Sequence, residues 1–194
     1  MIRTIPSLLM LSLFLAGCSG PGGGLTSAEE AEFLERSEEI AGALQGALEP
    51  RLKQAMLAGG PVAAIEVCQQ VAPSLTGATS DRFVGATVSR TALRLRNPDN
   101  APDARSRAIL ERWANRRRSG KLLPEAAIEA GDATVIVHRP ILTGPVCLNC
   151  HGDPGQMSAE LENTLARLYP QDAATGFREG DLRGAFRIEF TRSP

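Results

Sequence analysis

The sequence has few aromatic residues, few histidines and cysteines, and no large excess of charge of either sign. Only 4% of its 194 residues are aromatic, and it contains two His and four Cys. A core with so few rings must consist largely of aliphatic side chains and of any cofactor that the protein holds. The formal net charge is −1, and it becomes −2 without residues 1–17, which contain one Arg and no acid. This balance argues against nucleic acid or an anionic membrane surface as a partner.

The N-terminus lacks a hydrophobic run long enough to span a membrane. Its apolar stretch, residues 5–16, follows Arg3 and is about twelve residues long, whereas a spanning helix needs roughly 18 or more. The stretch ends in Leu15-Ala16-Gly17-Cys18, which matches the lipobox of bacterial lipoproteins. We therefore predict a lipoprotein signal peptide over residues 1–17 and a lipid on Cys18. An ordinary cleaved signal with an incidental cysteine is the alternative.

This signal predicts an exported protein, attached to a membrane on its periplasmic side. Residues 18–25 are rich in glycine and are expected to form a flexible, lipidated tether. Ser19 favours the outer membrane if the cell has two membranes. Residues 26–194 are long enough for one domain with its own core, and they contain no internal repeat.

Residues 26–58 are predicted to form a long N-terminal helix. Residues 26–29, Thr-Ser-Ala-Glu, read as a capping box, and apolar residues recur at four-residue steps from Ile40 to Met56. We expect Pro50 to kink or divide this helix and Gly59-Gly60 to end it.

The remaining elements indicate an α+β fold, with helices around a small antiparallel sheet. Further helices are predicted over residues 61–72, 101–118 and 158–168, with Asn100 and Ser158 as caps of the last two. Strands are expected over residues 83–86, 133–139 and 184–191. The last of these alternates apolar and charged residues, as a strand with one buried face does.

The most specific motif is Cys147-Leu148-Asn149-Cys150-His151, the C-x-x-C-H attachment signature of a c-type haem. In that chemistry the two thiols add across the haem vinyl groups, and the adjacent imidazole binds the iron as the proximal ligand. A thioredoxin-like dithiol and half of a zinc site are the competing interpretations. The predicted export agrees with haem attachment, because c-type haem is attached on that side of the membrane.

Cys68 is the one thiol that neither the lipobox nor the C-x-x-C-H motif explains. On the predicted helix its neighbours are apolar, so we expect the thiol to face the interior. Those neighbours are Ala64, Ile65, Val71 and Ala72. Two interpretations stay open: a buried cysteine that packs as a small hydrophobe, or a thiolate on the sixth coordination position of the iron, opposite His151.

Three other side chains are candidates for that sixth position. His138 lies on a predicted strand, where a lone histidine is more often a hydrogen-bonded core or surface residue than a ligand. Met56 and Met157 are weaker candidates, because methionine at helical spacing usually serves packing.

A basic cluster precedes the third predicted helix. It consists of Arg90, Arg94 and Arg96, whose charges suit the two propionates of a haem. The alternative is a solvated charged face with no ligand.

Four blocks of the sequence are informative when taken together. They are Ala64-Ile-Glu-Val-Cys68, Ser89-x-Thr91-x-Leu93-x-Leu95-Arg-Asn-Pro98, Cys147-x-x-Cys-His-Gly152 and Thr175-Gly-Phe-x-Glu-Gly-Asp-Leu-Arg-Gly-Ala185. This combination resembles the family of single-haem, PAS-like c-type domains, over roughly residues 30–191. Such domains occur alone in exported proteins and as the sensory modules of membrane-bound histidine kinases and chemoreceptors.

The resemblance implies a PAS-like antiparallel sheet with flanking helices, and one covalently attached haem c. It also implies axial ligation by His151 and by the cysteine of the first block, Cys68. His138 stands where an aromatic residue is common in the family, and this departure leaves alternative ligation open.

Three classes of function remain. The first is a sensing module that reports redox state or a diatomic gas to a signalling partner protein. The second is an electron carrier between membrane and periplasmic redox partners, which would keep the same iron ligands in both oxidation states. The third is a haem-free zinc protein that uses Cys68, Cys147, Cys150 and one histidine. An enzyme is not expected, because no base, nucleophile or metal triad is apparent beyond the haem residues.

Overall fold

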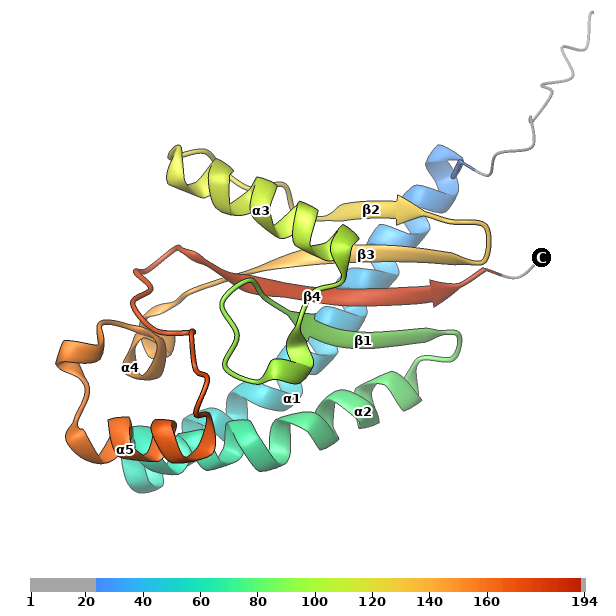
Figure 1. The fold of residues 1–194 in the computed structure, drawn as a ribbon. Helices are drawn as coiled ribbons and strands as arrows, with labels where there is room; N and C mark the ends of the chain where they lie inside the picture. The colour runs from blue at the N-terminus through green and yellow to red at the C-terminus, as the bar shows by residue number, and fades with distance from the viewer. Residues whose placement is uncertain (1–23, 193–194) are drawn as a thin grey trace, which may run out of the picture.

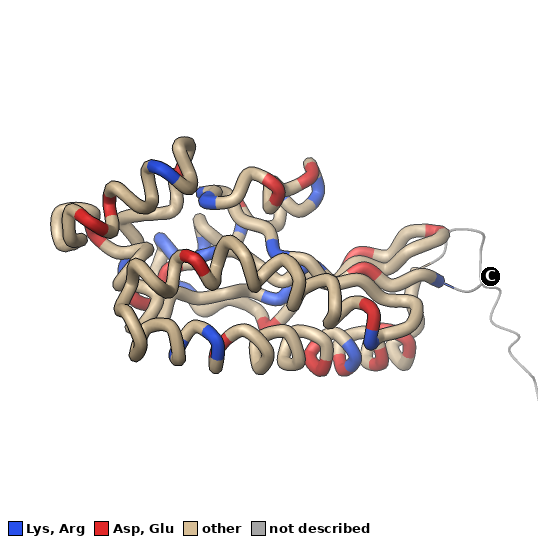
Figure 2. The backbone as a smooth tube through the Cα atoms, turned by 90° about the horizontal axis from the view of Figure 1, so that it is seen from below, with Lys and Arg blue, Asp and Glu red and all other residues tan. Residues whose placement is uncertain are grey.

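A computed structural model describes residues 24–192, so the predicted signal peptide, Cys18 and most of the predicted tether lie outside the described residues. The described chain is an α+β fold, with a four-stranded antiparallel sheet, helices on both faces and further helices at one end (Figure 1). Acidic and basic residues are interspersed along it (Figure 2). In this described part, no helix is both long and apolar enough to cross a membrane.

The N-terminal helix α1 spans Ser27–Glu66. The predicted capping box is confirmed: the Glu29 amide donates to Oγ1 of Thr26, and the Thr26 amide donates to the Glu29 carboxylate. Within α1 only Gly59 and Gly60 have non-helical dihedral angles, and Gly60 has a positive φ of 66° that favours glycine. The predicted break at these glycines is therefore confirmed, whereas Pro50 does not divide the helix.

The helical segment that follows this break is longer than residues 61–72. It continues through the end of α1 into a π-helical turn, Val67–Val71, and then into α2, Ala72–Arg82. Pro73 lies in the first turn of α2 and has no amide proton to donate to the preceding helix. The wider π-helical turn lies directly before it in the chain. Cys68 therefore lies on a local irregularity between two regular helices.

The sheet consists of β1 (Ala86–Thr91), β2 (Ala127–Ala130), β3 (Thr134–Leu142) and β4 (Leu182–Thr191). Its strand order is β1-β4-β3-β2, and all neighbours are antiparallel. The predicted strands over 133–139 and 184–191 are confirmed. The predicted strand over 83–86 was wrong, because α2 extends to Arg82 and the chain then turns at Gly85, whose φ is 75°.

The two faces of the sheet pack against different helices (Figure 1). Helix α1 covers the face that carries most of the core, which includes Ile40, Leu44, Val88, Val135, Val137, Ile188 and Phe190. Helix α3, Ala104–Arg118, covers the other face through Ile109, Leu110 and Trp113. The C-terminal strand β4 lies between β1 and β3 and contacts both helices.

Of the two helix caps predicted after α2, one is confirmed and one is wrong. Helix α5, Ala159–Leu168, is capped by Ser158, as the sequence predicts. Helix α3 is capped by Asp103, which accepts a hydrogen bond from the Ser106 amide at 2.7 Å, and not by Asn100. The reason is Pro102: the residue before a proline avoids the helical region, and Ala101 is accordingly extended.

Candidate functional site

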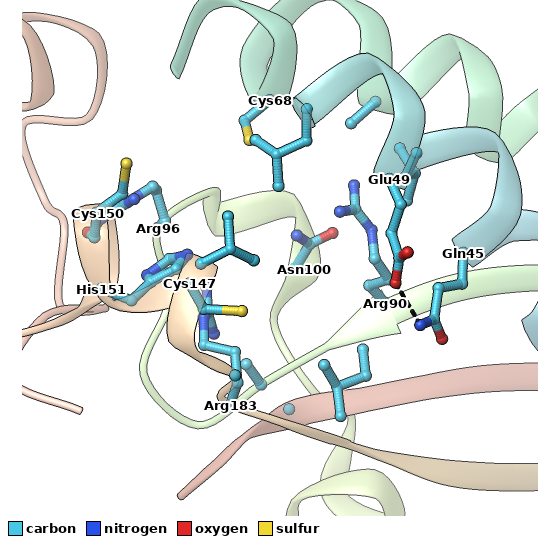
Figure 3. Close-up of a pocket in the computed structure, with 18 of the residues that line it drawn as sticks. Gln45, Glu49, Cys68, Arg90, Arg96, Asn100, Cys147, Cys150, His151 and Arg183 are labelled. Atoms are coloured by element: carbon cyan, nitrogen blue, oxygen red, sulfur yellow. Dashed lines mark hydrogen bonds between the residues drawn. The ribbon is translucent and has the colours of Figure 1, made fainter. Parts of the chain in front are cut away.

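A cavity of about 520 Å³ opens at the end of the sheet where the C-x-x-C-H segment, the π-helical turn and β1 meet (Figure 3). Its size lies within the range of roughly 300–1,000 Å³ typical of cofactor and ligand sites. The described residues that line it include Met56, Cys68, Arg90, Arg96, Cys147, Cys150, His151 and Arg183. Cys68 and the C-x-x-C-H segment, far apart in sequence, thus face one space.

The C-x-x-C-H segment forms two short helical turns, Pro145–Cys147 and α4, Leu148–His151. Both motif cysteines contribute to the cavity wall. The segment ends at Gly152, where a Cβ atom would lie only 2.5 Å from the carbonyl oxygen of Leu148. Glycine therefore lets the chain leave the turn while keeping both thiols and His151 at the cavity.

His151 is held as a neutral imidazole with one nitrogen committed to the protein. Its Nδ1 lies 2.6 Å from the carbonyl oxygen of Ala174 and donates to it. Burial, reinforced by nearby arginines, lowers the pKa of His151 to about 3. The Phe177 ring meets the imidazole edge-on, with ring centroids 6.2 Å apart. This arrangement leaves Nε2 with its lone pair, which is the form of histidine that binds metals.

Cys68 points into the cavity from the wall opposite His151 (Figure 3). Its side chain is exposed, and it lines the cavity. Burial by the surrounding protein raises the pKa of the thiol, and the charges of Arg90 and Arg96 oppose that shift. The expectation that Cys68 faces the interior is therefore wrong in its simple form: the residue is exposed and lines the cavity, and it is not part of the packed core.

The three predicted arginines have different environments. Arg90 lines the cavity, and burial lowers its pKa while the neighbouring Cys68 opposes this. Arg96 also lines it, but forms an ion pair with Asp172 at 2.9 Å. Arg94 is not among the lining residues: it donates to the carbonyl of Ala173 at 3.1 Å and stacks over Phe177. Arg90 is therefore the member of the predicted cluster best placed for an anionic ligand.

Arg183 is a cavity residue that the sequence did not reveal. In the pairing of β3 with β4, Ile141 faces Gly184 and Leu142 faces Leu182, so Arg183 is the extra residue of a β-bulge. Burial lowers its pKa to about 10, and Arg96 adds to the effect. Its Nη1 donates to the carbonyl of Arg94 at 3.2 Å. A half-buried guanidinium at the wall of a cavity favours a negatively charged ligand.

The described cavity wall carries more positive than negative charge. Its charged members are Arg90, Arg96, Arg183 and one carboxylate, Glu49. Glu49 accepts a hydrogen bond from Gln45 and pairs with Lys53. Since Arg96 is neutralised by Asp172, two arginines remain for a ligand that brings two negative charges.

The fold places the other candidate ligands of the iron in different surroundings. Met56 lines the cavity, whereas Met157 packs with Ile65 and Leu161 in a neighbouring apolar cluster. Among the residues that the structure describes, no three His, Cys, Asp or Glu side chains are grouped so as to hold a metal ion. The four-ligand zinc set is therefore not assembled in this structure.

His138 is a buried core residue on the α3 side of the sheet. It is fully buried, it is not among the lining residues of the cavity, and its Nε2 lies 2.9 Å from Oγ of Ser106. Its Nδ1 has no hydrogen-bond partner. This placement agrees with the more common role of such a histidine, a hydrogen-bonded residue of the core.

His138 predicts a loss of stability in acid. Burial lowers its pKa from 6.5 to about 4, so between pH 6.5 and 4 the unfolded chain binds a proton that the folded chain excludes. We expect this residue to reduce the free energy of unfolding by about 3 kcal/mol as the pH falls from 6.5 to 4. Urea titrations of wild type and His138→Gln across this range measure the effect. Parallel pH profiles of the two proteins would contradict it.

Comparison with known proteins gives one family and one related structure. The sequence profile of the Tll0287-like family, described as Tll0287, matches residues 26–191. A solved structure, the crystal structure of the cyanobacterial heme-protein Tll0287, is 23% identical, with a TM-score of 0.58. The match covers 87% of this chain and 98% of that chain, and it confirms the α+β fold with its long N-terminal helix. No curated protein matches the sequence.

Proposed function

Since the chain belongs to the Tll0287-like family, we propose that it is a c-type haem protein. Its cavity would hold one haem through thioether bonds to Cys147 and Cys150, with His151 and Cys68 as the axial ligands. The observation that carries the proposal is that Cys68 and the C-x-x-C-H segment face the same cavity from opposite walls. The cyanobacterial structure, described as a heme-protein, supports the choice of cofactor.

The chemistry of the cavity wall fits a haem. Apolar side chains such as Leu48, Leu95 and Phe186 suit the porphyrin faces, and the cavity has the volume of a cofactor site. Arg90 and Arg183 would donate hydrogen bonds to the two propionates, in place of the full set of three arginines expected from the sequence. Neutral His151 would offer Nε2 to the iron, because Nδ1 is bonded to Ala174.

A bound haem would supply a one-electron couple whose potential the axial residues set. Cys68 as a thiolate would favour the oxidised iron, because sulfur donates negative charge to it. The charges of Arg90 and Arg183 lower the cost of that thiolate, because they act against the burial that otherwise keeps the thiol protonated. Reduction of such an iron would weaken its attraction for the sulfur, so Cys68 would be the ligand more easily released.

We propose that this release makes the protein a sensing module for redox state or a diatomic gas. Cys68 lies on the π-helical turn between the glycine break of α1 and α2, so a change at its sulfur acts on a local irregularity of the helix. Movement of that turn would be the two-state element that a signalling partner protein reads. A sensor of this kind changes a ligand with oxidation state, and an electron carrier does not.

The haem itself is tested by an alkaline pyridine haemochrome spectrum. The protein is made together with the cytochrome c maturation machinery and extracted with acidified acetone before measurement. We expect the haem to stay on the polypeptide and to give the band position of a haem with saturated vinyl groups. A colourless or fully extractable product would contradict the proposal and favour the dithiol interpretation.

We also propose that Cys18 carries a lipid that holds the protein at the periplasmic side of a membrane, on the strength of the lipobox in the sequence. Cys18→Ser is expected to move the protein from the membrane fraction to the soluble fraction, because a lipid anchor is lost. Fractionation and immunoblotting measure the distribution. Continued membrane association of the variant would count against the lipobox interpretation.

A further inference from the structure

Arg96 and Asp172 form a buried ion pair beside His151, outside the set of groups that would touch the cofactor through iron or thioether bonds. The Arg96 side chain is 7% exposed and that of Asp172 is 10% exposed. Nε of Arg96 donates to Oδ2 of Asp172 at 3.0 Å, and Nη2 lies 2.9 Å from the same oxygen. Both contacts between Arg96 and Asp172 are thus made to one carboxylate oxygen, which leaves Oδ1 of Asp172 for another donor.

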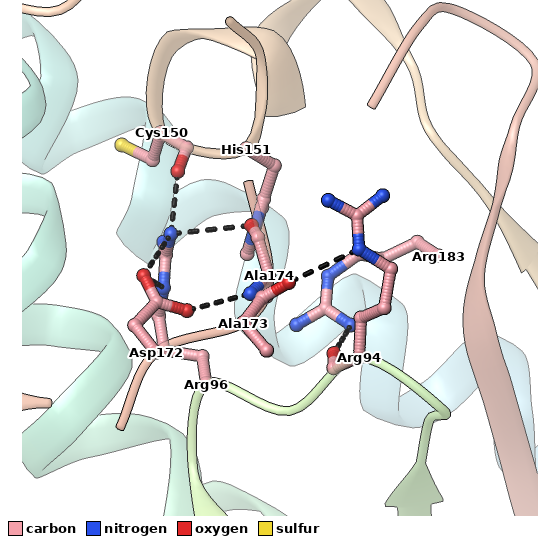
Figure 4. A network of polar contacts seen from close by, with 8 residues as sticks. All are labelled: Arg94, Arg96, Cys150, His151, Asp172, Ala173, Ala174 and Arg183. Atoms are coloured by element: carbon pink, nitrogen blue, oxygen red, sulfur yellow. Dashed lines mark hydrogen bonds and ion pairs between the residues drawn. The ribbon is translucent and has the colours of Figure 1, made fainter. Parts of the chain in front are cut away.

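The pair connects the two segments that meet at His151 (Figure 4). Arg96 Nη2 donates to the carbonyl of Cys150 at 2.5 Å, within the C-x-x-C-H helix, and to that of Ala174 at 3.4 Å. Oδ1 of Asp172 accepts the amide of Ala174 at 2.8 Å. The carbonyl of Ala174 in turn accepts Nδ1–H of His151. The contacts close a ring through Arg96, Cys150, His151, Ala174 and Asp172.

The same two segments are joined further along the chain. The amides of Phe177 and Gly176 donate to the carbonyls of His151 and Gly152 at 2.9 and 2.6 Å. The carbonyls of three consecutive residues, Cys150, His151 and Gly152, therefore accept hydrogen bonds at the end of the C-x-x-C-H helix. Arg96 is the donor to the first of these carbonyls. The position of the Ala174 carbonyl relative to His151 depends on these contacts together.

We propose that Arg96 and Asp172 are positioning residues for His151: they fix the Ala174 carbonyl that accepts Nδ1–H, and thereby set how strongly Nε2 donates to an iron. This inference rests on the proposed haem function. A firmly placed acceptor on Nδ1 raises the basicity of a ligating histidine. The Asp172 carboxylate also neutralises Arg96 close to the site, and so removes a positive charge that would oppose oxidised iron.

Two substitutions separate charge from geometry. Asp172→Asn keeps the size of the side chain but removes its charge, so Arg96 is left uncompensated. Arg96→Lys keeps the charge but removes the planar guanidinium that contacts three acceptors at once. We expect Asp172→Asn to raise the midpoint potential by at least 59 mV, a tenfold change in the one-electron equilibrium. Arg96→Lys is expected to broaden the low-spin EPR signals, since His151 is held less uniformly.

The matched control is Glu38→Gln, which removes a carboxylate from an ion pair with Arg139 that lies outside the cavity lining. It should leave the potential and the EPR signals unchanged. Asp172→Glu, which keeps the charge, should have a midpoint potential close to that of the wild type. A purely structural ion pair would change thermal stability in all variants of Asp172 and Arg96 without moving the potential.

The inference is overturned if Asp172→Asn and Arg96→Lys carry stoichiometric covalent haem with wild-type potential and EPR spectrum. That result leaves the haem proposal intact, because the haemochrome reports haem independently. Should both variants fail to fold, nitrogen-15 NMR of the wild-type holoprotein provides the test. A His151 Nδ1–H signal that resists solvent exchange supports the inference, and rapid exchange of that proton overturns it.

Discussion

Replacing both Cys147 and Cys150 with serine is expected to abolish covalent haem, so that all pigment is removed by acidified acetone. The two thiols are the only side chains of the C-x-x-C-H segment that can add across vinyl groups, and both line the cavity. Burial raises the pKa of Cys150 to about 11, so this thiol is not a reactive thiolate of the thioredoxin type in the folded protein. The measurement is the pyridine haemochrome of the extracted polypeptide.

The matched control for this double variant is Cys68→Ala. It removes a thiol from the same cavity, but not one that is proposed to form a thioether, so its haem should resist extraction. Each single variant, Cys147→Ser or Cys150→Ser, should retain haem through one bond, with a band position between those of saturated and unsaturated haem. Haem that stays attached in the double variant would refute attachment at these residues.

Cys68→Ala is expected to change the oxidised absorption spectrum and to raise the midpoint potential. If Cys68 binds the iron as proposed, its loss would remove the negative charge that stabilises oxidised iron, and axial ligation shifts haem potentials over a range of roughly 0.8 V. We expect a rise on the order of 0.1 V or more. His138→Ala and Met56→Leu are the controls: both replace residues weighed for the sixth position, and neither should alter the wild-type spectrum. An unchanged spectrum in Cys68→Ala would remove Cys68 from the iron.

The same variant separates the sensor from the electron carrier. If Cys68 leaves the iron on reduction, the reduced spectra of wild type and Cys68→Ala should be alike, whereas the oxidised spectra differ. Added carbon monoxide should then bind both reduced proteins at similar rates. Reduced spectra that differ as much as the oxidised ones would show that Cys68 stays bound, which is the behaviour of a carrier.

Much of the fold was predictable because the signals are local. The capping box at Thr26 and the cap at Ser158 depend on residues three positions apart, and both were found. The alternation in β4 identified that strand, since one of its faces packs on the core. The short strand β2 was missed, because its four residues, Ala127–Ala130, pair only with β3 at the sheet edge and carry little pattern of their own.

The rest of the site depends on contacts between distant segments. Asp172, which neutralises Arg96, lies 76 residues away along the chain, and no local pattern joins the two. Arg183 faces the cavity because a bulge interrupts the alternation of β4. Arg94 and Arg96 share a sequence cluster with Arg90, but one stacks on Phe177 and the other binds Asp172. Sequence clustering showed the charge there, while tertiary contacts decide which charges remain available.

The position of β4 in the sheet has a consequence for biogenesis. The last strand of the described chain lies between β1 and β3, so β1 has no strand partner and β3 pairs only with β2 until residues 182–191 have emerged. Pairings of such long sequence separation form slowly. A polypeptide that crosses a membrane N-terminus first would therefore present Cys147 and Cys150 to attachment enzymes while the cavity is still open. Covalent loading would precede the closing of the sheet, and a chain cut before β4 should accept haem without acquiring a protected pocket.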